Sequence, residues 1–302
     1  MAISPWKLAV DAENRELVPH GTEAFPIGCY RDELHKLPVP WHWHDEWEAA
    51  VVARGSTVVA TGLGEVRIGP GDGFFINAGV LHECADAVPG EECVYHSMCF
   101  RPALIGAPGS VFWEKYVEPI QRSGALRLLV LSRDVAWQRE ALSCIERAWQ
   151  CVAGEPEDFE LEVRGALGRL AALLARNLPP ASAAAQSAAA LRDEARIKAM
   201  LACVRARYAD ELTAADIARS AAVSESECLR CFKRVIGMTP MQYVKQYRLE
   251  QAEALLRTGR CRVGEAAERC GFREMSYFAR AFRQRRGMTP SEYAAARGGS
   301  EA

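Results

Sequence analysis

A pattern of fourteen positions occurs twice near the carboxyl end of this 302-residue chain, with the copies fifty residues apart. It reads R-x-F-[K/R]-x-x-x-G-M-T-P-x-[Q/E]-Y over residues 230–243 and again over residues 280–293. A solenoid needs at least about three repeats to bury a continuous core, so two copies are too few for one. The repeat therefore predicts a pair of similar subdomains in this region.

Helix boundaries can be read in both copies. Four Ser or Thr residues are each followed three positions later by Asp, Glu or Gln, which is the pattern of a capped helix start: Thr213, Ser224, Thr239 and Thr289. Gly237 and Gly287 follow predicted helices where a left-handed residue commonly ends a helix. A short helix, a tight turn and a second helix form a helix-turn-helix unit, and the region predicts two such units.

The second helix of each unit, predicted over 224–236 and 274–286, has two different faces. Apolar residues at helical spacing mark the face that packs into the core: Cys228, Cys231, Phe232 and Val235, then Phe278, Ala281 and Phe282. The opposite face is mostly polar and basic: Ser226, Leu229, Arg230 and Lys233, then Ser276, Ala279, Arg280 and Arg283. Guanidinium groups pair with guanine edges and other basic side chains with phosphates, so these faces suit the major groove of DNA. The core position also accounts for the C-x-x-C of Cys228 and Cys231 without a metal.

The residues from about 25 to 101 favour short strands. Brief β-favouring segments at 47–52, 56–59, 65–68 and 74–76 are separated by glycines. Many short strands with Gly-rich turns are typical of a β-barrel or sandwich. Apolar residues at helical spacing then predict two helices, over 134–153 and 157–177.

Charge is distributed unevenly along the chain. Residues 191–302 hold 21 Lys and Arg against 14 Asp and Glu, whereas residues 1–190 hold 16 against 25. A basic carboxyl-terminal region predicts an anionic partner. No uncharged apolar run reaches the about 18 residues of a membrane helix, and residues 1–10 lack the apolar run of a secretory signal. We therefore expect a cytoplasmic protein without a membrane partner, whose eleven cysteines are reduced.

Four residues in the amino-terminal half form a metal-ligand pattern. Its first part reads H-x-H-x₃-E-x₆-G from residue 42 to 55, and its second part reads G-x₅-N-x-G-x₂-H from residue 71 to 82. Alternate strand residues share a face, so His42 and His44 point to one side, where Glu48 and His82 can join them from neighbouring strands. Three imidazoles and a carboxylate suit divalent Fe, Mn, Ni, Cu or Zn.

This pattern resembles the two motifs of the cupin fold, with Asn77 in place of the usual Pro of the second motif. The resemblance implies a small barrel with a divalent metal as candidate cofactor, held by His42, His44, Glu48 and His82. Two alternatives remain open. The same side chains could bind a hydroxyl or carboxylate of an organic ligand, or could persist without any ligand.

The carboxyl-terminal region resembles the DNA-binding domain of AraC/XylS-type transcription regulators. The likeness is carried by the motifs LTAADIA at 212–218, FK at 232–233, GMTP at 237–240, YRLEQA at 247–252 with LL at 255–256, GF at 271–272, YFARAF at 277–282 and GMTP at 287–290. It implies two helix-turn-helix units joined by a long helix over 240–258. Carried over by position, it implies base contacts by Ser226, Leu229 and Arg230 and by Met275, Ser276 and Arg280. Two departures are Leu229, whose apolar side chain suits a thymine methyl group, and Glu274, which would repel phosphate.

Together these features predict an α+β multidomain protein, with an N-terminal cupin-like β-barrel plus helices and a C-terminal all-α double helix-turn-helix. The predicted parts are a sensor domain over 1–132, a helical dimerisation segment over 133–178, a linker over 179–192 and a DNA-binding domain over 193–298. We expect a homodimeric transcription regulator, not an enzyme. It would sense a small-molecule effector and bind double-stranded promoter DNA, with Lys233 and Arg283 as further DNA contacts and RNA polymerase as a further partner.

Two other functions fit parts of the sequence. A metal-dependent cupin enzyme, such as a dioxygenase or isomerase, would use the His and Glu pattern, but catalysis has no need of the double repeat. A protein that binds RNA or an acidic partner would use the basic half, but the chain lacks RNA-module signatures and interleaved stacking aromatics. The regulator hypothesis accounts for both halves.

Overall fold

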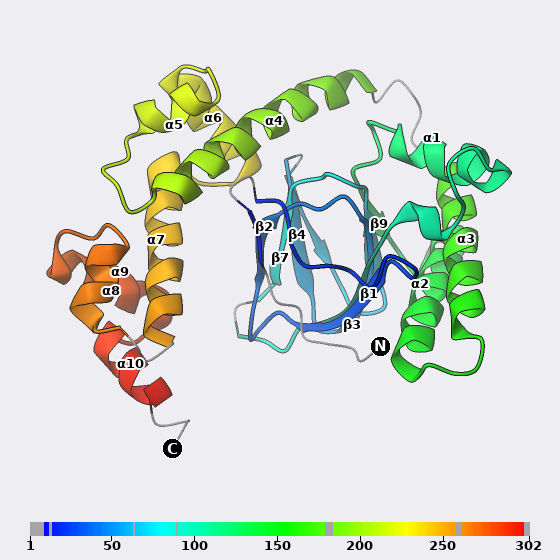
Figure 1. The fold of residues 1–302 in the computed structure, drawn as a ribbon, viewed down its shortest axis with the longest axis horizontal. Coiled ribbons are helices and arrows are strands. Elements are labelled where there is room, and N and C mark those ends of the chain that lie inside the picture. Colours follow the sequence, from blue (N-terminus) through cyan, green and yellow to red (C-terminus); the bar gives the residue numbers. More distant parts are fainter. Residues whose placement is uncertain are drawn as a thin grey trace. The chain divides into compact units, whose positions relative to one another are not determined.

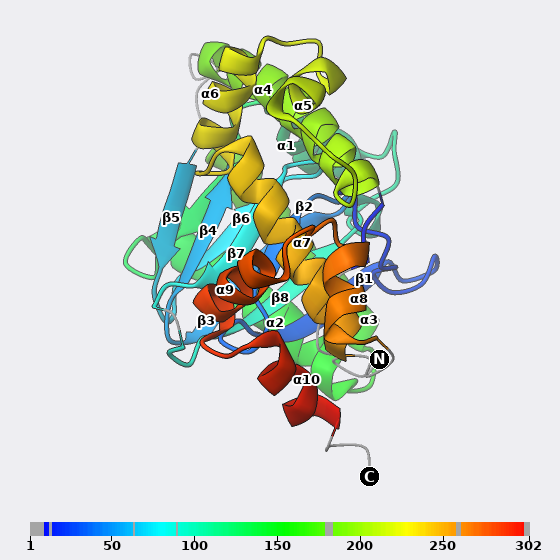
Figure 2. The same cartoon turned by 90° about the vertical axis from the view of Figure 1, so that its left-hand side faces the viewer.

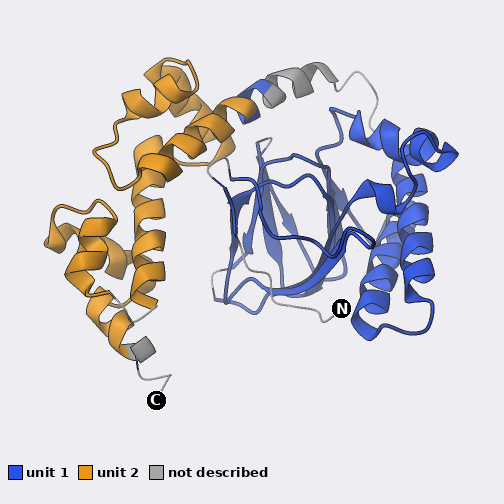
Figure 3. Ribbon diagram, viewed as in Figure 1, with its two compact units in different colours: residues 1–194 blue, residues 195–302 orange. Residues whose placement is uncertain are grey.

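The computed structural model describes residues 9–11, 14–62, 64–88, 90–178, 184–257 and 261–298. The chain divides into two compact units, residues 1–194 and 195–302 (Figure 3). The first contains two antiparallel sheets with helices against one of them, and the second consists of helices (Figure 1). The fold class predicted from the sequence is confirmed.

The barrel of the first unit is built from two sheets. The larger sheet has the strand order β1-β8-β3-β6-β9, and the smaller one has the order β2-β7-β4-β5, with antiparallel neighbours throughout. The strands are β1 (Ile27–Glu33), β2 (Val39–His42), β3 (Trp47–Arg54), β4 (Thr57–Thr61), β5 (Gly64–Ile68), β6 (Gly73–Ile76), β7 (His82–Asp86), β8 (Val94–Phe100) and β9 (Leu128–Leu131). The four segments predicted as strands correspond to β3, β4, β5 and β6.

Helices α2 (Ala136–Gly154) and α3 (Phe159–Arg176) cover the outer face of the larger sheet (Figure 1). On β3, Trp47 and Ala49 pack into the core that the sheet shares with these helices, whereas Ala50 and Val52 pack into the core between the two sheets. Because strand residues alternate between faces, Glu48 points into the barrel with Ala50 and Val52. Shorter helical segments precede β9: η1 (Pro102–Leu104), η2 (Trp113–Val117) and α1 (Glu118–Gln121).

Helix α4 (Ala184–Arg207) begins inside the stretch 179–192 that the sequence assigned to a linker. Residues 179–183 of that stretch lie outside the described residues. The boundaries of the four predicted parts therefore stay a prediction. Helices α2 and α3, which the prediction set apart as a dimerisation segment, share a core with the barrel.

The second unit is arranged around one long helix, α7 (Pro240–Arg257). In both Figure 1 and Figure 2, α5 and α6 lie near one end of α7, and α8, α9 and α10 lie toward the other. The bounds are α5 (Ala214–Ser220), α6 (Glu225–Val235), α8 (Val263–Arg269), α9 (Met275–Arg286) and α10 (Pro290–Gly298). Each end thus carries one helix-turn-helix unit, α5–α6 or α8–α9, as the repeat predicted.

The predicted helix starts are confirmed, with one difference in detail. Thr213 forms a complete capping box with Asp216 before α5. Before α6, the Ser224 hydroxyl accepts a hydrogen bond from the Glu227 N–H at 3.2 Å. In a complete capping box the Glu227 carboxylate would also accept a hydrogen bond from the Ser224 N–H. Here the carboxylate forms ion pairs with Arg230 and, at 3.3 Å, with Arg196 instead. Only one of the two capping hydrogen bonds is therefore present, because two guanidinium groups compete for the carboxylate.

A glycine in the second unit offers a test of this packing. Gly271 has a φ of +77°, and a Cβ there would lie 2.7 Å from the Ala209 carbonyl oxygen. Gly271→Ala is therefore expected to lower the free energy of unfolding by about 1–3 kcal/mol, as measured by denaturant unfolding. The control is Gly264→Ala in α8, where a Cβ meets nothing within 4 Å and helix propensity favours Ala by up to about 1 kcal/mol. Equal stability of the two variants would contradict the close approach at Gly271.

Candidate functional site

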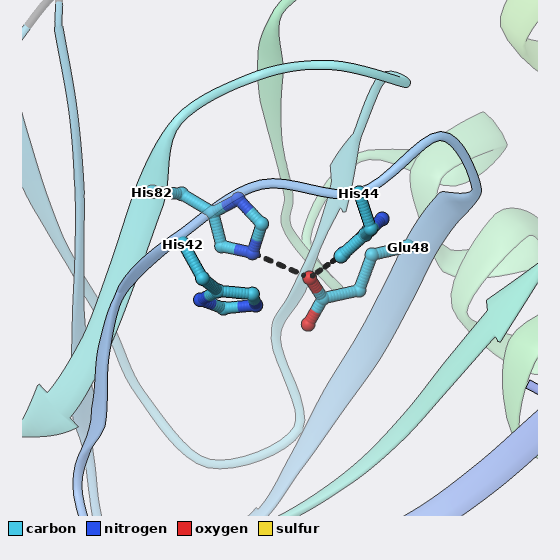
Figure 4. A group of neighbouring side chains, drawn as sticks. All are labelled: His42, His44, Glu48 and His82. Carbon is cyan, nitrogen blue, oxygen red and sulfur yellow. Dashed lines mark ion pairs between the residues drawn. The ribbon is translucent and has the colours of Figure 1, made fainter. Parts of the chain in front are cut away.

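Four side chains of the barrel converge on one buried point (Figure 4). His42 ends β2 and pairs in register with His82, which begins β7, so their rings lie 4.2 Å apart between centroids. His44 follows two residues after His42, and Glu48 points inward from β3. One ligand atom from each residue lies within 4.8 Å of all the others, and all four residues are buried. The structure thus brings together the four residues that the sequence nominated as metal ligands.

The three histidines are held in the same orientation by the backbone. Nδ1 of His42 lies 2.9 Å from the Pro40 carbonyl oxygen, Nδ1 of His44 lies 3.1 Å from that of Glu46, and Nδ1 of His82 lies 2.8 Å from that of Val80. A carbonyl oxygen only accepts, so each Nδ1 must carry the proton and donate it. When the ring is neutral, its Nε2 then carries the lone pair. Three basic Nε2 atoms are therefore presented to the barrel interior, in the tautomer that a metal ion requires.

The Glu48 carboxylate faces two of these nitrogens. Its Oε2 atom lies 2.9 Å from Nε2 of His82 and 3.4 Å from Nε2 of His44 (Figure 4). Neither the Glu48 Oε2 nor the His82 Nε2 has a hydrogen bond of acceptable geometry among the described residues. Because two acceptor atoms repel at such a distance, a proton or a cation is needed between them.

Two pKa shifts describe the charge state of the site. Burial raises the pKa of Glu48, but the charge of His82 and the contacts with both His44 and His82 outweigh it and hold this pKa well below its usual range. Burial, together with the charges of His82 and His44, holds the pKa of His42 well below its usual value. An ionised carboxylate and a neutral imidazole are the forms that bind metal ions.

The donor set therefore fits a divalent cation. Imidazole nitrogens and carboxylate oxygens are the ligands preferred by Zn, Fe, Mn, Ni and Cu. The other ring nitrogen of each histidine is already held by a backbone carbonyl oxygen.

Asn77, which replaces the usual Pro of the second cupin motif, has a structural function. Its amide group donates hydrogen bonds to the carbonyl oxygens of Ile120 and Leu126, at 2.8 and 3.1 Å.

Two further residues, which the sequence analysis did not include, lie beside this cluster. Glu16 and His20 lie on the irregular segment before β1, and both side chains are 1% exposed. Oε2 of Glu16 lies 3.3 Å from Nε2 of His20 and 3.9 Å from Nε2 of His42. An E-x₃-H spacing outside any predicted helix or strand is a weak signal, so only the fold identifies these two residues.

The second unit presents the residues predicted to contact DNA. All eight are exposed: Ser226, Leu229, Arg230 and Lys233 on α6, and Met275, Ser276, Arg280 and Arg283 on α9. The core faces of both helices are buried as predicted, including Cys228 and Cys231. Glu274 is the residue before α9, so its carboxylate lies at the helix end where phosphate would otherwise be attracted.

Helix α7 connects the two units that carry these faces. On one side, the ring of Phe232 from α6 lies 5.9 Å from that of Tyr243 on α7. On the other side, Arg285 of α9 pairs with Glu250 of α7 at 2.9 Å, and Arg286 pairs with Glu253. These two arginines pair with carboxylates of another helix, whereas Arg230 on the predicted DNA face pairs with Glu227 of its own helix.

A barrel with a buried cluster of potential metal ligands and two helix-turn-helix units are typical of regulators that sense a ligand and bind DNA, and comparison with known families agrees. The AraC-like ligand binding domain matches residues 26–225, and a helix-turn-helix domain matches residues 217–296. The chain belongs to the AraC family of transcription regulators. This confirms the predicted family and the prediction of a regulator rather than an enzyme.

The chain is similar to the following proteins. YdeC of Bacillus subtilis strain 168, an uncharacterized HTH-type transcriptional regulator, is 28% identical over 288 residues, which cover 94% of this chain and 97% of YdeC. The HTH-type transcriptional activator RhaR of Yersinia pestis bv. Antiqua strain Angola is 25% identical and covers 83% of each chain. An AraC-type regulator structure from Chromobacterium violaceum is 26% identical with a TM-score of 0.34, over 35% of this chain and 96% of its own. Among the described helices, none has the length and apolar character of a membrane span.

Proposed function

We propose that this regulator senses a small-molecule effector at a divalent metal centre formed by His42, His44, Glu48 and His82. The observation that supports this most is the common orientation of the three imidazoles, which donate through Nδ1 to backbone carbonyl oxygens, with Nε2 of His44 and His82 facing the Glu48 carboxylate. A bound cation would supply a positive charge that attracts an oxygen donor of the effector. The protein supplies the four buried side chains and the fixed orientation of their imidazole rings.

Sensing requires that the effector distinguish two states of the regulator. A ligand with equal affinity for both states changes nothing, however tightly it binds. The direct test measures the binding of full-length protein to promoter DNA, with and without added divalent metal and candidate effectors. A metal-dependent change in DNA affinity supports the proposal, and identical affinity with metal present or chelated contradicts it.

The proposed DNA contacts come from α6 and α9. Arg230 and Arg280 occupy equivalent positions of the two repeats and suit guanine edges, while Lys233 and Arg283 suit phosphates. Leu229, Ser226, Met275 and Ser276 complete the two faces. Their common exposure supports this set, and the boundaries 193–298 for the DNA-binding domain belong to the same proposal.

Arg230→Ala and Arg280→Ala are each expected to weaken binding to the preferred sequence by about 1–3 kcal/mol, at different base pairs. The measurement is a binding isotherm on promoter DNA and on variants with single base changes. In free protein Arg230 pairs with Glu227, so DNA must displace this exposed contact. Exposed ion pairs are weak, typically about 0–1 kcal/mol, so we expect base readout to exceed this cost.

Arg286→Ala is the matched control, since Arg286 lies on α9 but pairs with Glu253 of α7. It should leave base preference unchanged. Salt dependence should remain steep in all three variants, because phosphate contacts dominate it. If both Arg230→Ala and Arg280→Ala keep the wild-type base preference, the assignment of these faces to base readout is wrong.

Self-association is proposed to involve the outer side of α3. Leu161 is 68% exposed there, and a Cβ at Gly165 or Gly168 would meet nothing within 4 Å. An apolar side chain beside two small residues allows close approach of a second helix, which supports a homodimer through the 133–178 segment. Sedimentation of the full chain tests this.

Action in the cytoplasm and contact with RNA polymerase follow from promoter binding and stay predictions.

A further inference from the structure

A short turn of the barrel contacts two of the four proposed metal ligands. Residues 77–81 connect β6 to β7, and His82 follows them directly. The Val80 carbonyl oxygen lies 2.8 Å from Nδ1 of His82, and the Gly79 N–H donates to the His44 carbonyl oxygen at 2.8 Å. Groups that hold the second nitrogen of a metal-bound histidine fix the direction of its ring. The conformation of this turn is therefore linked to the positions of both histidines.

The carboxylate of Glu194, on helix α4, holds the same turn. Its Oε1 atom accepts a hydrogen bond from the Leu81 N–H at 2.6 Å, and its Oε2 atom forms an ion pair with Arg127. The Arg127 carbonyl oxygen in turn accepts a hydrogen bond from the Asn77 N–H at 3.0 Å. The side chains of Glu194 and Arg127 are 5% and 7% exposed. Glu194 thus contacts the turn at the residue next to His82.

A buried contact of this kind has two distinct states. Desolvation of two charges costs about as much as their attraction returns, so apolar side chains of similar size often stabilise a protein equally well. The ion pair with Arg127 and the hydrogen bond from Leu81 are, however, formed together only when the turn has one particular conformation. Once the turn departs from it, a buried carboxylate loses its partners there, which is strongly unfavourable. Glu194 is therefore either fully bound to the turn or withdrawn from it.

Helix α4 belongs to both compact units. It spans Ala184–Arg207, and Glu194 is the last residue of the first unit (Figure 3). Two residues later, in the second unit, Arg196 pairs with Glu227 of α6 at 3.3 Å. The Glu227 carboxylate also pairs with Arg230, the proposed base contact of the first helix-turn-helix unit. Printed in one helix, the two residues therefore connect the turn beside His82 with the carboxylate that holds Arg230.

Coordination of His82 at the centre would restrict the turn. The ring of His82 would be held through Nε2, and its Nδ1 would hold the Val80 carbonyl oxygen. The Leu81 N–H lies between these two residues in the chain, so it would be kept in the direction in which it meets Glu194. Occupancy of the centre then favours the bound state of Glu194 over the withdrawn state. Such a difference between two states is what a ligand needs in order to shift an equilibrium.

We infer that Glu194 is a positioning residue that couples the metal centre to helix α4 and, through Arg196 and Glu227, to Arg230. This rests on the function proposed above, in which the centre regulates DNA binding. Helix α4 is the element whose equilibrium both sites bias, which is the physical requirement for coupling between them. By linkage, DNA binding must change metal affinity by the same factor as metal changes DNA affinity.

The test uses full-length protein, Co²⁺ as the probe and amide hydrogen exchange as the readout. In wild type, saturating Co²⁺ is expected to slow exchange of the amides of residues 195–207 by about 5–150-fold, the usual range of coupling between two sites. The double variant Arg127→Met, Glu194→Met removes both charges together and replaces them with apolar side chains of similar size. It should still bind Co²⁺, but the ratio of exchange rates without and with Co²⁺ should fall to about one.

The double variant Arg54→Met, Glu92→Met is the matched control. It removes a 2.9 Å ion pair of the same unit, at the end of β3 and outside both the turn and α4. This variant should keep the Co²⁺-dependent protection of residues 195–207. DNA affinity with and without Co²⁺, measured on the preferred sequence, should lose its metal dependence only in the variant at Arg127 and Glu194.

The outcomes separate this inference from the metal centre itself. If wild type binds Co²⁺ without any change of exchange in residues 195–207, the centre stands and the coupling is wrong. Protection that persists in the Arg127 and Glu194 variant, or that is lost in the control as well, also overturns the inference. If wild type binds no Co²⁺, both proposals are wrong. If circular dichroism shows that the variant is unfolded, the Leu81 amide of wild type decides, because Co²⁺ should slow its exchange and an unchanged rate contradicts the coupling.

Discussion

Phe282→Ala is expected to lower the free energy of unfolding of the second unit by about 3–5 kcal/mol. Phe282 is 1% exposed and packs between Phe278 and Tyr293, with ring centroids 5.7 and 5.5 Å away. Removal of this ring leaves a cavity in the core that holds α7 to α9, and the surrounding helices can close it only in part. This is the largest stability effect that we expect from a single substitution in the second unit.

The sequence offers a way to measure each unit separately. All seven Trp residues lie at or before position 149, so Trp fluorescence reports the first unit only, whereas helical circular dichroism reports both. Phe282→Ala should move the helical transition to lower denaturant and leave the fluorescence transition in place. Met288→Ala, at a 39% exposed position, should stay within about 0.5 kcal/mol of wild type. A shift of the fluorescence transition in Phe282→Ala would show that the units do not unfold independently.

His82→Ala is expected to reduce divalent metal affinity by at least about 100-fold, more than the 10–100-fold typical of a group that only supports a ligand. His82 is fully buried and lies closest to the Glu48 carboxylate, so no other donor can replace it without rearrangement of the strands. Elemental analysis of protein exposed to Mn²⁺, Co²⁺, Ni²⁺ and Zn²⁺ and then dialysed measures the metal bound per chain.

His96→Ala is the matched control, because His96 lies in the same barrel but outside the quartet. Its ring stacks on Trp149 at 3.8 Å and its Nδ1 pairs with Glu146 at 3.2 Å. The variant should keep its metal. Retention of metal by His82→Ala, or loss of metal by His96→Ala as well, would remove the quartet as the binding site.

The helical half of the fold could be predicted well from local sequence. Cap residues such as Thr213, and the glycines Gly237 and Gly287, act within one helical turn, so their effects are readable in a short window. At Ser224 the predicted helix start is confirmed, but the second hydrogen bond of a capping box is absent, because Arg196 from a different helix competes for the Glu227 carboxylate. Competition between distant groups of this kind has no local signature.

The candidate site could be predicted in part for the same reason. His42, His44 and Glu48 follow a strand period, and their convergence needs only the alternation of side chains. His82 could be identified from the second cupin motif. Glu16 and His20 could not be identified, because their segment has no periodicity. The segment is positioned by backbone hydrogen bonds with Trp43, a residue far from it in sequence.

The ties of α6 and α9 to α7 have a consequence for the target genes. At about 1.5 Å per residue, the 18 residues of α7 measure about 27 Å from end to end. The helix therefore holds α6 and α9 at a fixed separation. One inserted base pair would swing the second contact sequence by about 34° around the duplex axis, since a turn takes about 10.5 base pairs. On the proposed contacts of α6 and α9, the base sequences of the two contacted sites can therefore vary between promoters, but the number of base pairs between the sites should be fixed by α7.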